Sequence, residues 1–211
     1  MNEKFKRVFF GLIFILIIWN GVLFSEISFR LVFIVIGLIS LYEMWRLRNG
    51  KSKFFPLLFI VIPFTIIHFY EIKNTENHFD PSIILFILML TWIFDTFAYI
   101  FGIKFGKNKI LPSISPKKSW EGFIGGFIFT ILASILCFNY IEFFLKIDNQ
   151  NIITMVLPFT ATIGDFTVSY FKRKAKIKDS GNIIPGHGGM LDRMDALTLT
   201  IPVVYLINIF I

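Results

Sequence analysis

The sequence has little charge, only one cysteine, and neither of two common enzyme motifs. Only 17% of its 211 residues are charged, whereas a soluble domain carries about 25%. The single cysteine, Cys137, excludes an intrachain disulfide and a cysteine metal cluster, and we expect it to be a small buried hydrophobe. The chain has no glycine-rich loop ending in Lys-Ser/Thr, which excludes a P-loop enzyme. No Ser-His-Asp arrangement is recognisable, and His187, which lies between glycines, does not by itself indicate a hydrolase.

Apolar residues dominate the rest of the chain. Hydrophobic residues make up 55% of it, including 28 Phe, and the mean hydropathy is +0.73. Because a helix needs about 20 mainly apolar residues to cross a bilayer, we predict an all-α, polytopic integral membrane protein with about seven transmembrane helices. The first stretch runs straight into a second, so we expect a retained span and not a cleaved signal peptide. The predicted spans are residues 8–24, 29–45, 54–70, 82–103, 122–145, 152–171 and 194–211.

Lys and Arg are unevenly distributed among the predicted loops. Of the 21 basic residues, all but Arg30, Lys73 and Lys146 precede the first span or lie in the even-numbered connections. Because Lys and Arg accumulate in cytoplasmic loops, we predict a cytoplasmic N-terminus and an external C-terminus. The net charge of +7 then reflects topology, so we expect contact with the lipid bilayer and no nucleic-acid partner.

Asp95 and Asp165, two of the acids within the predicted spans, indicate a functional site. Asp95 falls in the fourth span and Asp165 in the sixth. A charge inside the hydrocarbon costs about 2.5–3.5 kcal/mol on insertion scales and usually marks function. The alternative is a carboxylate satisfied by a Lys or Ser of a neighbouring helix.

The connection between the fourth and fifth spans contains a compact polar motif. Residues 115–122 read Ser-Pro-Lys-Lys-Ser-Trp-Glu-Gly, a short turn with two lysines, two hydroxyls and one acid. Lysines supply point charges for a phosphate, and hydroxyls and turn amides donate hydrogen bonds to it. The alternative is an ordinary basic cytoplasmic loop.

The connection between the sixth and seventh spans carries the strongest signal. Its first half, residues 169–179, is rich in Lys and Arg and suits a polyphosphate at the membrane surface. The glycines around His187 allow the backbone to approach a ligand closely. Asp192 and Asp195 share a face if the seventh helix starts there, and such paired carboxylates suit Mg²⁺. Carboxylates for a hard cation beside many basic groups are typical of phosphoryl or nucleotidyl transfer.

The stretch 169–195 closely resembles the signature of the phosphatidate cytidylyltransferases, or CDP-diacylglycerol synthases. That signature runs Ser, Lys-Arg, Lys-Asp, a Pro/Gly turn, His-Gly-Gly, Asp-Arg and Asp. The strings 95–99 and 115–122 are also similar to those of this family, so the resemblance covers roughly residues 95–195. The signature elements are Ser169, Lys172, Arg173, Lys178, Asp179, Pro185, His187, Gly188, Gly189, Asp192, Arg193 and Asp195.

The resemblance implies an activity, a cofactor and a place in the cell. In this family the phosphate of phosphatidate attacks the α-phosphorus of CTP and pyrophosphate leaves. We therefore expect CTP and phosphatidate as substrates, one or two Mg²⁺ ions, a homodimer, and a bacterial inner membrane location with the active site facing the cytoplasm. We also expect three N-terminal membrane helices (1–81), with packing and lipid contact as their role, and a catalytic membrane domain (82–211).

The resemblance also implies roles for individual residues. We expect the metal to be held by Asp165, Asp192 and Asp195. The residues expected to be catalytic are Asp165, Lys172, Arg173, Lys178, Asp179, Asp192 and Asp195. The residues expected to bind substrate are Ser115, Lys117, Lys118, Ser169, His187, Gly188, Gly189 and Arg193.

Other functions remain possible on the sequence alone. A membrane kinase that uses CTP on a lipid alcohol would release CDP, and a cytidylyltransferase could act on a different lipid phosphate. A transporter could use Asp95 and Asp165 as an ion path, but that function does not explain the motif at 169–195. A structural scaffold leaves the dense polar loops unexplained.

Overall fold

A computed structural model describes residues 3–48, 52–70, 72–73, 79–140, 147, 149–183 and 188–210. Within these residues helices make up most of the structure and strands almost none of it, which confirms the predicted all-α class. A two-residue antiparallel pair, in which Ile72 faces Asp80, is the exception. The helices are α1 (Glu3–Phe24), α2 (Glu26–Leu47), α3 (Phe54–Ile66), the 3-10 turn η1 (Ile67–Phe69), α4 (Ser82–Phe105), α5 (Trp120–Tyr140), α6 (Gln150–Lys174), α7 (Leu191–Met194) and α8 (Leu197–Phe210), and the strands are β1 (Ile72–Lys73) and β2 (Phe79–Asp80).

The first two helices form a tight hairpin around Ser25. The hydroxyl of Ser25 accepts a hydrogen bond from the backbone N–H of Ser28 at 3.1 Å, and the Ser28 hydroxyl accepts one from the N–H of Ser25 at 2.9 Å. This reciprocal pair satisfies backbone donors that the start of a helix leaves without partners. A one-residue connection therefore suffices to reverse the chain.

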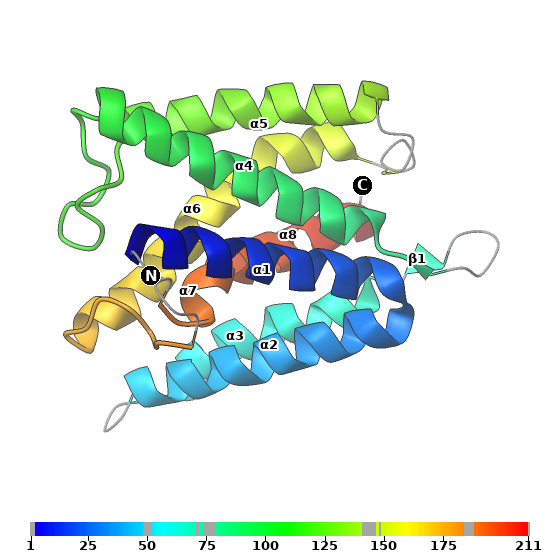
Figure 1. Ribbon diagram of the computed structural model, residues 1–211, viewed down its shortest axis with the longest axis horizontal. Helices are drawn as coiled ribbons and strands as arrows, with labels where there is room; N and C mark the ends of the chain where they lie inside the picture. Colours follow the sequence, from blue (N-terminus) through cyan, green and yellow to red (C-terminus); the bar gives the residue numbers. More distant parts are fainter. Residues whose placement is uncertain are drawn as a thin grey trace.

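The helices pack as an elongated bundle (Figure 1). Helix α4 packs against α5, α6 against α8, and α2 and α3 against each other. Helix α2 also contacts α7, and α3 contacts α8, so the N-terminal helices lie against the C-terminal ones. The loop between α4 and α5 and the segment after α6 lie at the same end of the bundle as the start of α1 (Figure 1). The α1–α2 turn and the β1–β2 pair lie at the other end.

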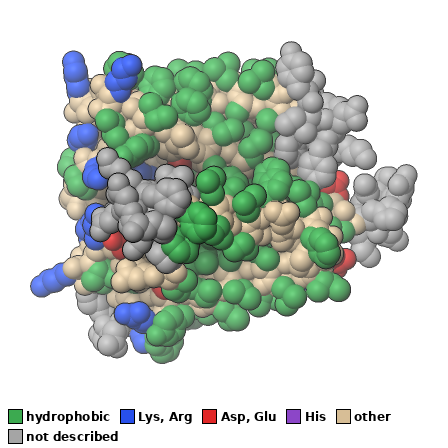
Figure 2. All heavy atoms as spheres, in the orientation of Figure 1, with side chains coloured by type: hydrophobic (Ala, Val, Ile, Leu, Met, Phe, Trp, Pro, Cys, Tyr) green, Lys and Arg blue, Asp and Glu red, His purple; other side chains and the backbone are tan. Residues whose placement is uncertain are grey.

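The surface of the bundle suits a membrane. Within the described residues, five helical segments are long and apolar enough to cross a bilayer, and two shorter apolar helices, Phe9–Phe24 and Phe54–Phe69, accompany them. Hydrophobic side chains cover the flank seen in Figure 2, and Lys and Arg side chains gather at the end that carries the α4–α5 loop. The membrane class is thus confirmed, and Cys137 is buried as predicted. The count of seven spans stays a prediction.

The seventh predicted span differs from the structure at its start. Instead of one helix from residue 194, the chain forms the short α7, turns at Asp195 and Ala196, and continues as α8. The carboxylate of Asp195 accepts a hydrogen bond from the N–H of Ala196 at 2.8 Å, and its carbonyl accepts one from the Thr198 hydroxyl at 2.6 Å. These local bonds compete with helical ones and separate Asp195 from the helix that carries Asp192.

Candidate active site

A cavity of about 640 Å³ lies at the loop-bearing end of the bundle, among α4, α5, α6 and α7. It brings together three segments that are far apart in the sequence. The sequence-predicted residues that line it are Asp95, Ser115, Lys117, Lys118, Asp165, Asp192 and Asp195. Carboxylates and lysines therefore face one space that also borders apolar helix surfaces such as Phe94 and Phe123.

The loop between α4 and α5 is closed at its base by backbone and side-chain bonds. An isolated antiparallel bridge joins Lys109 to Ser119. The carboxylate of Glu121, in the first turn of α5, accepts hydrogen bonds from the backbone N–H of Asn108 at 3.0 Å and from its side-chain amide at 2.8 Å. The loop is thus held as a closed unit, which presents Lys117 and Lys118 to the cavity.

Lys118 and Asp165 form an ion pair across the cavity. The hydroxyl of Ser169, one helical turn after Asp165, donates a hydrogen bond to the same carboxylate at 3.0 Å. Burial disfavours the charged form of Lys118, but the carboxylates of Asp165, Asp95 and Asp195 together outweigh this effect and raise the pKa of the lysine. Lys118 therefore keeps its positive charge near neutral pH, as a phosphate-binding group requires.

Asp192 is the most heavily bonded acid of the site. Its Oδ1 accepts a hydrogen bond from the Lys172 ammonium group at 2.6 Å, in an ion pair whose side chains are each only 9% exposed. Its Oδ2 accepts bonds from the backbone N–H groups of Ser180 at 2.8 Å and Gly189 at 3.0 Å, and from the Ser180 hydroxyl at 3.0 Å. Donors from three residues, Lys172, Ser180 and Gly189, thus hold the Asp192 carboxylate in one geometry.

Asp195 reaches the cavity because α6 allows a close approach. A Cβ atom at Gly164 would lie only 2.5 Å from the carbonyl oxygen of Asp195 and 3.2 Å from the Thr198 hydroxyl. Only glycine fits there without a shift, because real Cβ atoms do not approach other atoms so closely. The residue before Asp165 therefore lets Asp165 and Asp195 line the same cavity.

Several predicted site residues lie outside the cavity lining. The guanidinium group of Arg173 donates hydrogen bonds to the carbonyls of Ile114 at 3.1 Å and Ile177 at 2.8 Å, so it joins the two polar loops. Lys178, Asp179 and Arg193 are exposed. Gly188 adopts a φ of +85°, where a Cβ atom would lie 2.9 Å from Asp192 Oδ2. His187 lies outside the described residues.

The structure also adds residues that were not among the expected site residues. Tyr99 and Ser119, which belong to the strings 95–99 and 115–122, line the cavity, and so do Lys109 and Thr162, which lie outside these strings. For Lys109 and Thr162, a position near a motif was the only available signal. Glu43, a buried acid of α2, contacts the residues that hold Asp192. It lies inside the predicted second span, so the high cost of a charge inside the hydrocarbon, which indicated a function for Asp95 and Asp165, indicates one for Glu43 as well.

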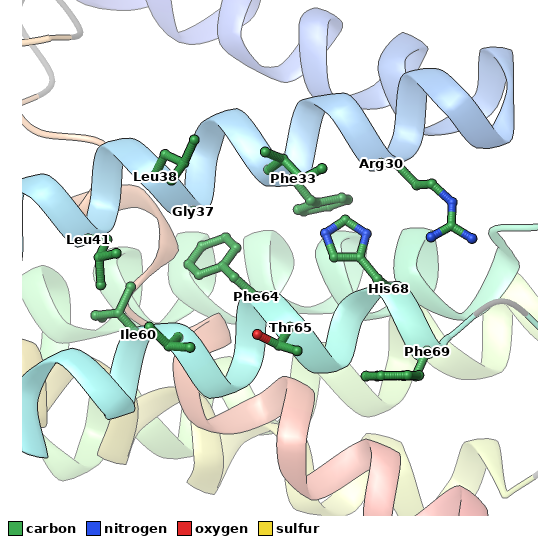
Figure 3. A pocket seen from close by; sticks show the side chains of 12 residues that line it. Arg30, Phe33, Gly37, Leu38, Leu41, Ile60, Phe64, Thr65, His68 and Phe69 are labelled. Atoms are coloured by element: carbon green, nitrogen blue, oxygen red, sulfur yellow. The ribbon is translucent and has the colours of Figure 1, made fainter.

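A second hollow, of about 560 Å³, lies between α2 and α3 and differs in character (Figure 3). Its walls are mainly apolar, with Phe33, Ile60 and Phe64 among them. Arg30 lies at its edge and pairs with Glu26 at 3.0 Å. Among the described residues no acid lines this hollow, so these residues do not offer the combination of acids and cations that phosphate chemistry requires.

The acids of the first cavity suit a metal ion that the substrate helps to bind. Within the described residues, no three of His, Cys, Asp and Glu converge as a preformed metal cluster. Mg²⁺ is usually held through one or two carboxylates, with substrate phosphates and water as the other ligands. Asp165 and Asp195 line the cavity beside Lys117 and Lys118, and this donor set fits such an ion. It does not form a closed protein cage.

The known proteins that this chain resembles are cytidylyltransferases. The model of the cytidylyltransferase family matches residues 57–210, from α3 to the end of α8. A phosphatidate cytidylyltransferase of Rickettsia typhi is 35% identical, with alignment over 98% of this chain and 92% of the relative. One of Rickettsia prowazekii is 34% identical over the same shares. One of Staphylococcus haemolyticus is 40% identical over 68% of this chain and 53% of the relative.

Proposed function

This chain belongs to the cytidylyltransferase family, and we propose that it transfers the cytidylyl group of CTP to phosphatidate. The products are CDP-diacylglycerol and pyrophosphate, and the reaction serves phospholipid biosynthesis. The observation that carries this proposal is the cavity itself, where Lys117, Lys118 and four aspartates meet beside apolar helix surfaces. A lipid phosphate from the bilayer and a nucleotide from water can both reach such a position.

The reaction needs positioning and charge neutralisation more than proton transfer. A phosphate oxygen of phosphatidate forms a bond to the α-phosphorus of CTP, and the bond from that phosphorus to the oxygen bridging to the β-phosphorus breaks. Pyrophosphate leaves with the electron pair. A phosphate monoester has a second pKa of about 6, so the nucleophile is already ionised near neutral pH. The site accordingly offers cations and carboxylates, and no general base is required.

The lysines of the cavity suit the phosphates of the two substrates. Lys117 and Lys118 line the cavity from the closed loop, and Lys118 stays charged because the neighbouring carboxylates, chiefly Asp165, raise its pKa. Lys172 is held by Asp192, so its charge has a fixed position next to the cavity. These groups stabilise the negative charge that develops on the transferred and leaving phosphates.

We further propose that Mg²⁺ is the cofactor, as one or two ions. Asp165 and Asp195 would hold it together with the substrate phosphates, with Asp192 as the adjacent acid. A bound Mg²⁺ would neutralise phosphate charge and orient the α-phosphorus. The fit of the donor set described above supports this proposal.

The same reasoning extends to topology and assembly. We propose seven crossings with a cytoplasmic N-terminus, in a bacterial inner membrane with the cavity facing the cytoplasm. The gathering of Lys and Arg at the cavity end supports this orientation, and the relatives are bacterial. We also propose a homodimer, as the resemblance to the family implies.

Release of pyrophosphate from CTP by the purified protein in detergent tests the function. We expect release only when CTP, phosphatidate and Mg²⁺ are all present. Formation of CDP that depends on a lipid alcohol would instead identify a kinase. No reaction of CTP under any of these conditions would overturn the proposal.

A further inference from the structure

A buried carboxylate of α2 is bonded to the connection that carries Asp192. Glu43 is only 1% exposed. Its Oε1 accepts a hydrogen bond from the N–H of Met190 at 3.1 Å, and its Oε2 accepts bonds from the N–H of Leu191 at 2.9 Å and the Ser180 hydroxyl at 2.6 Å. A buried carboxylate is unfavourable unless several donors satisfy it. All three donors come from the described ends of the α6–α8 connection, residues 180–183 and 188–191.

Ser180 links Glu43 directly to Asp192. Its Oγ lies 2.6 Å from Glu43 Oε2 and 3.0 Å from Asp192 Oδ2. Its backbone N–H donates to the same Asp192 oxygen at 2.8 Å. Because one hydroxyl group contacts both carboxylates, a shift of Glu43 would reach Asp192 through a single side chain.

The connection is shaped to receive the Glu43 carboxylate. A Cβ atom at Gly181 would collide with Glu43 Oε1, and one at Gly189 would collide with Glu43 Oε2. Both glycines therefore leave the space that the carboxylate fills. The N–H of Gly189 also donates to Asp192 at 3.0 Å, so the same residue accommodates Glu43 and holds Asp192.

Glu43 itself does not line the cavity, and its burial keeps it from the substrates. Its effect on the reaction must therefore pass through the residues it holds. We propose that Glu43 is a positioning residue for the transfer reaction, an inference that rests on the proposed function. Its carboxylate anchors the connection to α2 and so keeps Asp192, with the Lys172 ammonium group bound to it, at the cavity.

The test compares Glu43→Gln and Glu43→Asp with a control in the same helix. Ser40→Ala, one turn earlier, removes a buried hydroxyl that has no hydrogen-bond partner among the described residues. Glu43→Gln places an amide N–H₂, which is a donor, against the three groups that donate to Glu43, so their hydrogen bonds are partly lost.

For Glu43→Gln we expect kcat to fall about 100-fold, as for a misplacement of about 1 Å at an active site. The KM for CTP should stay near that of the unchanged protein. Glu43→Asp should restore part of kcat, and Ser40→Ala should match the unchanged protein.

Limited trypsin digestion gives a readout that does not depend on activity. Lys176 and Lys178 are exposed in this connection. We expect Glu43→Gln to be cut there faster than Ser40→Ala, while both keep the same thermal unfolding midpoint in detergent. Unchanged kcat and unchanged digestion in Glu43→Gln would overturn the proposal. The proposal would also be overturned if Glu43→Gln lost kcat together with a lowered unfolding midpoint and Glu43→Asp restored neither.

Ser180→Ala keeps the proposal testable if Glu43→Gln folds poorly, because it removes the hydroxyl that links the two carboxylates and leaves Glu43 in place. Ser180→Ala should lower kcat as well, and an unchanged kcat in this variant would overturn the proposal. Where Glu43→Gln folds, combining it with Ser180→Ala should lose no more kcat than Glu43→Gln alone, because the two residues act in one chain of contacts. Fully additive losses would overturn the proposal. If the unchanged protein releases no pyrophosphate, the proposed function fails, whereas the digestion comparison still reports whether Glu43 holds the connection.

Discussion

At the scale of residues, the site is organised by pairs of opposite charge. Lys118 pairs with Asp165 and Lys172 pairs with Asp192. On the sequence alone, the intramembrane acids have an alternative role as carboxylates satisfied by a neighbouring Lys or Ser. For Asp165 both partners exist, since Ser169 also bonds to it. Such satisfaction does not exclude function, because the pair faces a cavity that also contains Asp95 and Asp195.

The buried pair of Lys172 and Asp192 predicts a stability effect. Lys172→Met leaves a buried carboxylate without its cation, which should lower the free energy of unfolding by about 3–5 kcal/mol. Lys172→Met combined with Asp192→Asn removes both charges and should regain part of that loss, although activity stays absent. Thermal unfolding in detergent measures the stability of both variants relative to the unchanged protein. A double variant less stable than Lys172→Met would contradict the assignment.

The acids of the cavity predict a metal-dependent effect. Chelation by EDTA should abolish pyrophosphate release, and added Mg²⁺ should restore it. Asp195→Asn should raise the Mg²⁺ concentration needed for half-maximal activity about 10- to 100-fold, because it removes one ligand charge. Asp80→Asn, at the opposite end of the bundle, is the matched control. The same Mg²⁺ requirement in Asp195→Asn and the unchanged protein would remove Asp195 from the metal site.

At the scale of elements, α6 presents its functional groups on one face. Asp165, Ser169 and Lys172 follow at spacings of four and three residues, so they lie above one another along the helix. Ser169 and Lys172 are buried, whereas Ile163 and Tyr170 are exposed on other faces of the helix. This face of α6 connects the loop before α5, through Lys118, to the connection after α6, through Asp192.

The close contact of α6 with the start of α8 predicts the effect of a small substitution. Gly164→Ala would push a methyl group against the Asp195 carbonyl and separate the two segments. We expect a loss of about 1–3 kcal/mol in stability, typical of overpacking, and a fall in kcat, because Asp165 and Asp195 move apart. Ile163→Ala, at the exposed neighbouring position, should cost much less of both. Wild-type kcat and stability in Gly164→Ala would show that the contact can relax freely.

At the scale of the whole molecule, the bundle separates charge along its length. The cavity, the two polar loops and the Lys and Arg side chains that gather in Figure 2 share one end of the bundle (Figures 1 and 2). The N-terminal helices take part in this arrangement beyond packing in lipid. Glu43 bonds to the α6–α8 connection, and the Tyr70 hydroxyl donates to the carbonyl of Ile201 at 2.8 Å.

The proposed orientation predicts which end a membrane-impermeant reagent can reach. Cys137 is buried and can be replaced by Ser, which leaves a cysteine-free background. A charged maleimide added to intact cells should label Glu26→Cys, which lies at the α1–α2 turn, and should label Lys178→Cys only after the membrane is opened. The reverse pattern would overturn the orientation, and labelling of both in intact cells would show that the reagent crosses the membrane.

The sequence by itself determined the class of the protein, its helices and the chemistry of its loops. Long apolar runs can cross a bilayer only as structures that satisfy their own backbone groups, so six of the predicted spans lie close to observed helices. The motifs at 95–99, 115–122 and 169–195 indicated phosphoryl or nucleotidyl transfer, because carboxylates and basic groups at that spacing suit phosphates and a hard cation. Asp95, Ser115, Lys117, Lys118, Asp165, Asp192 and Asp195 accordingly line one cavity.

Only the tertiary structure decided which of these groups meet. Arg173 bonds to carbonyls of both polar loops, whereas Lys178 is exposed, although both belong to the same motif. Asp192 and Asp195 are three residues apart, yet the turn after α7 gives them different partners. Glu43 lies 137 positions before Ser180 and still bonds to it. Spacing along a chain determines neighbours within one helix, whereas contacts between helices depend on where glycines let backbones approach and where buried acids find donors.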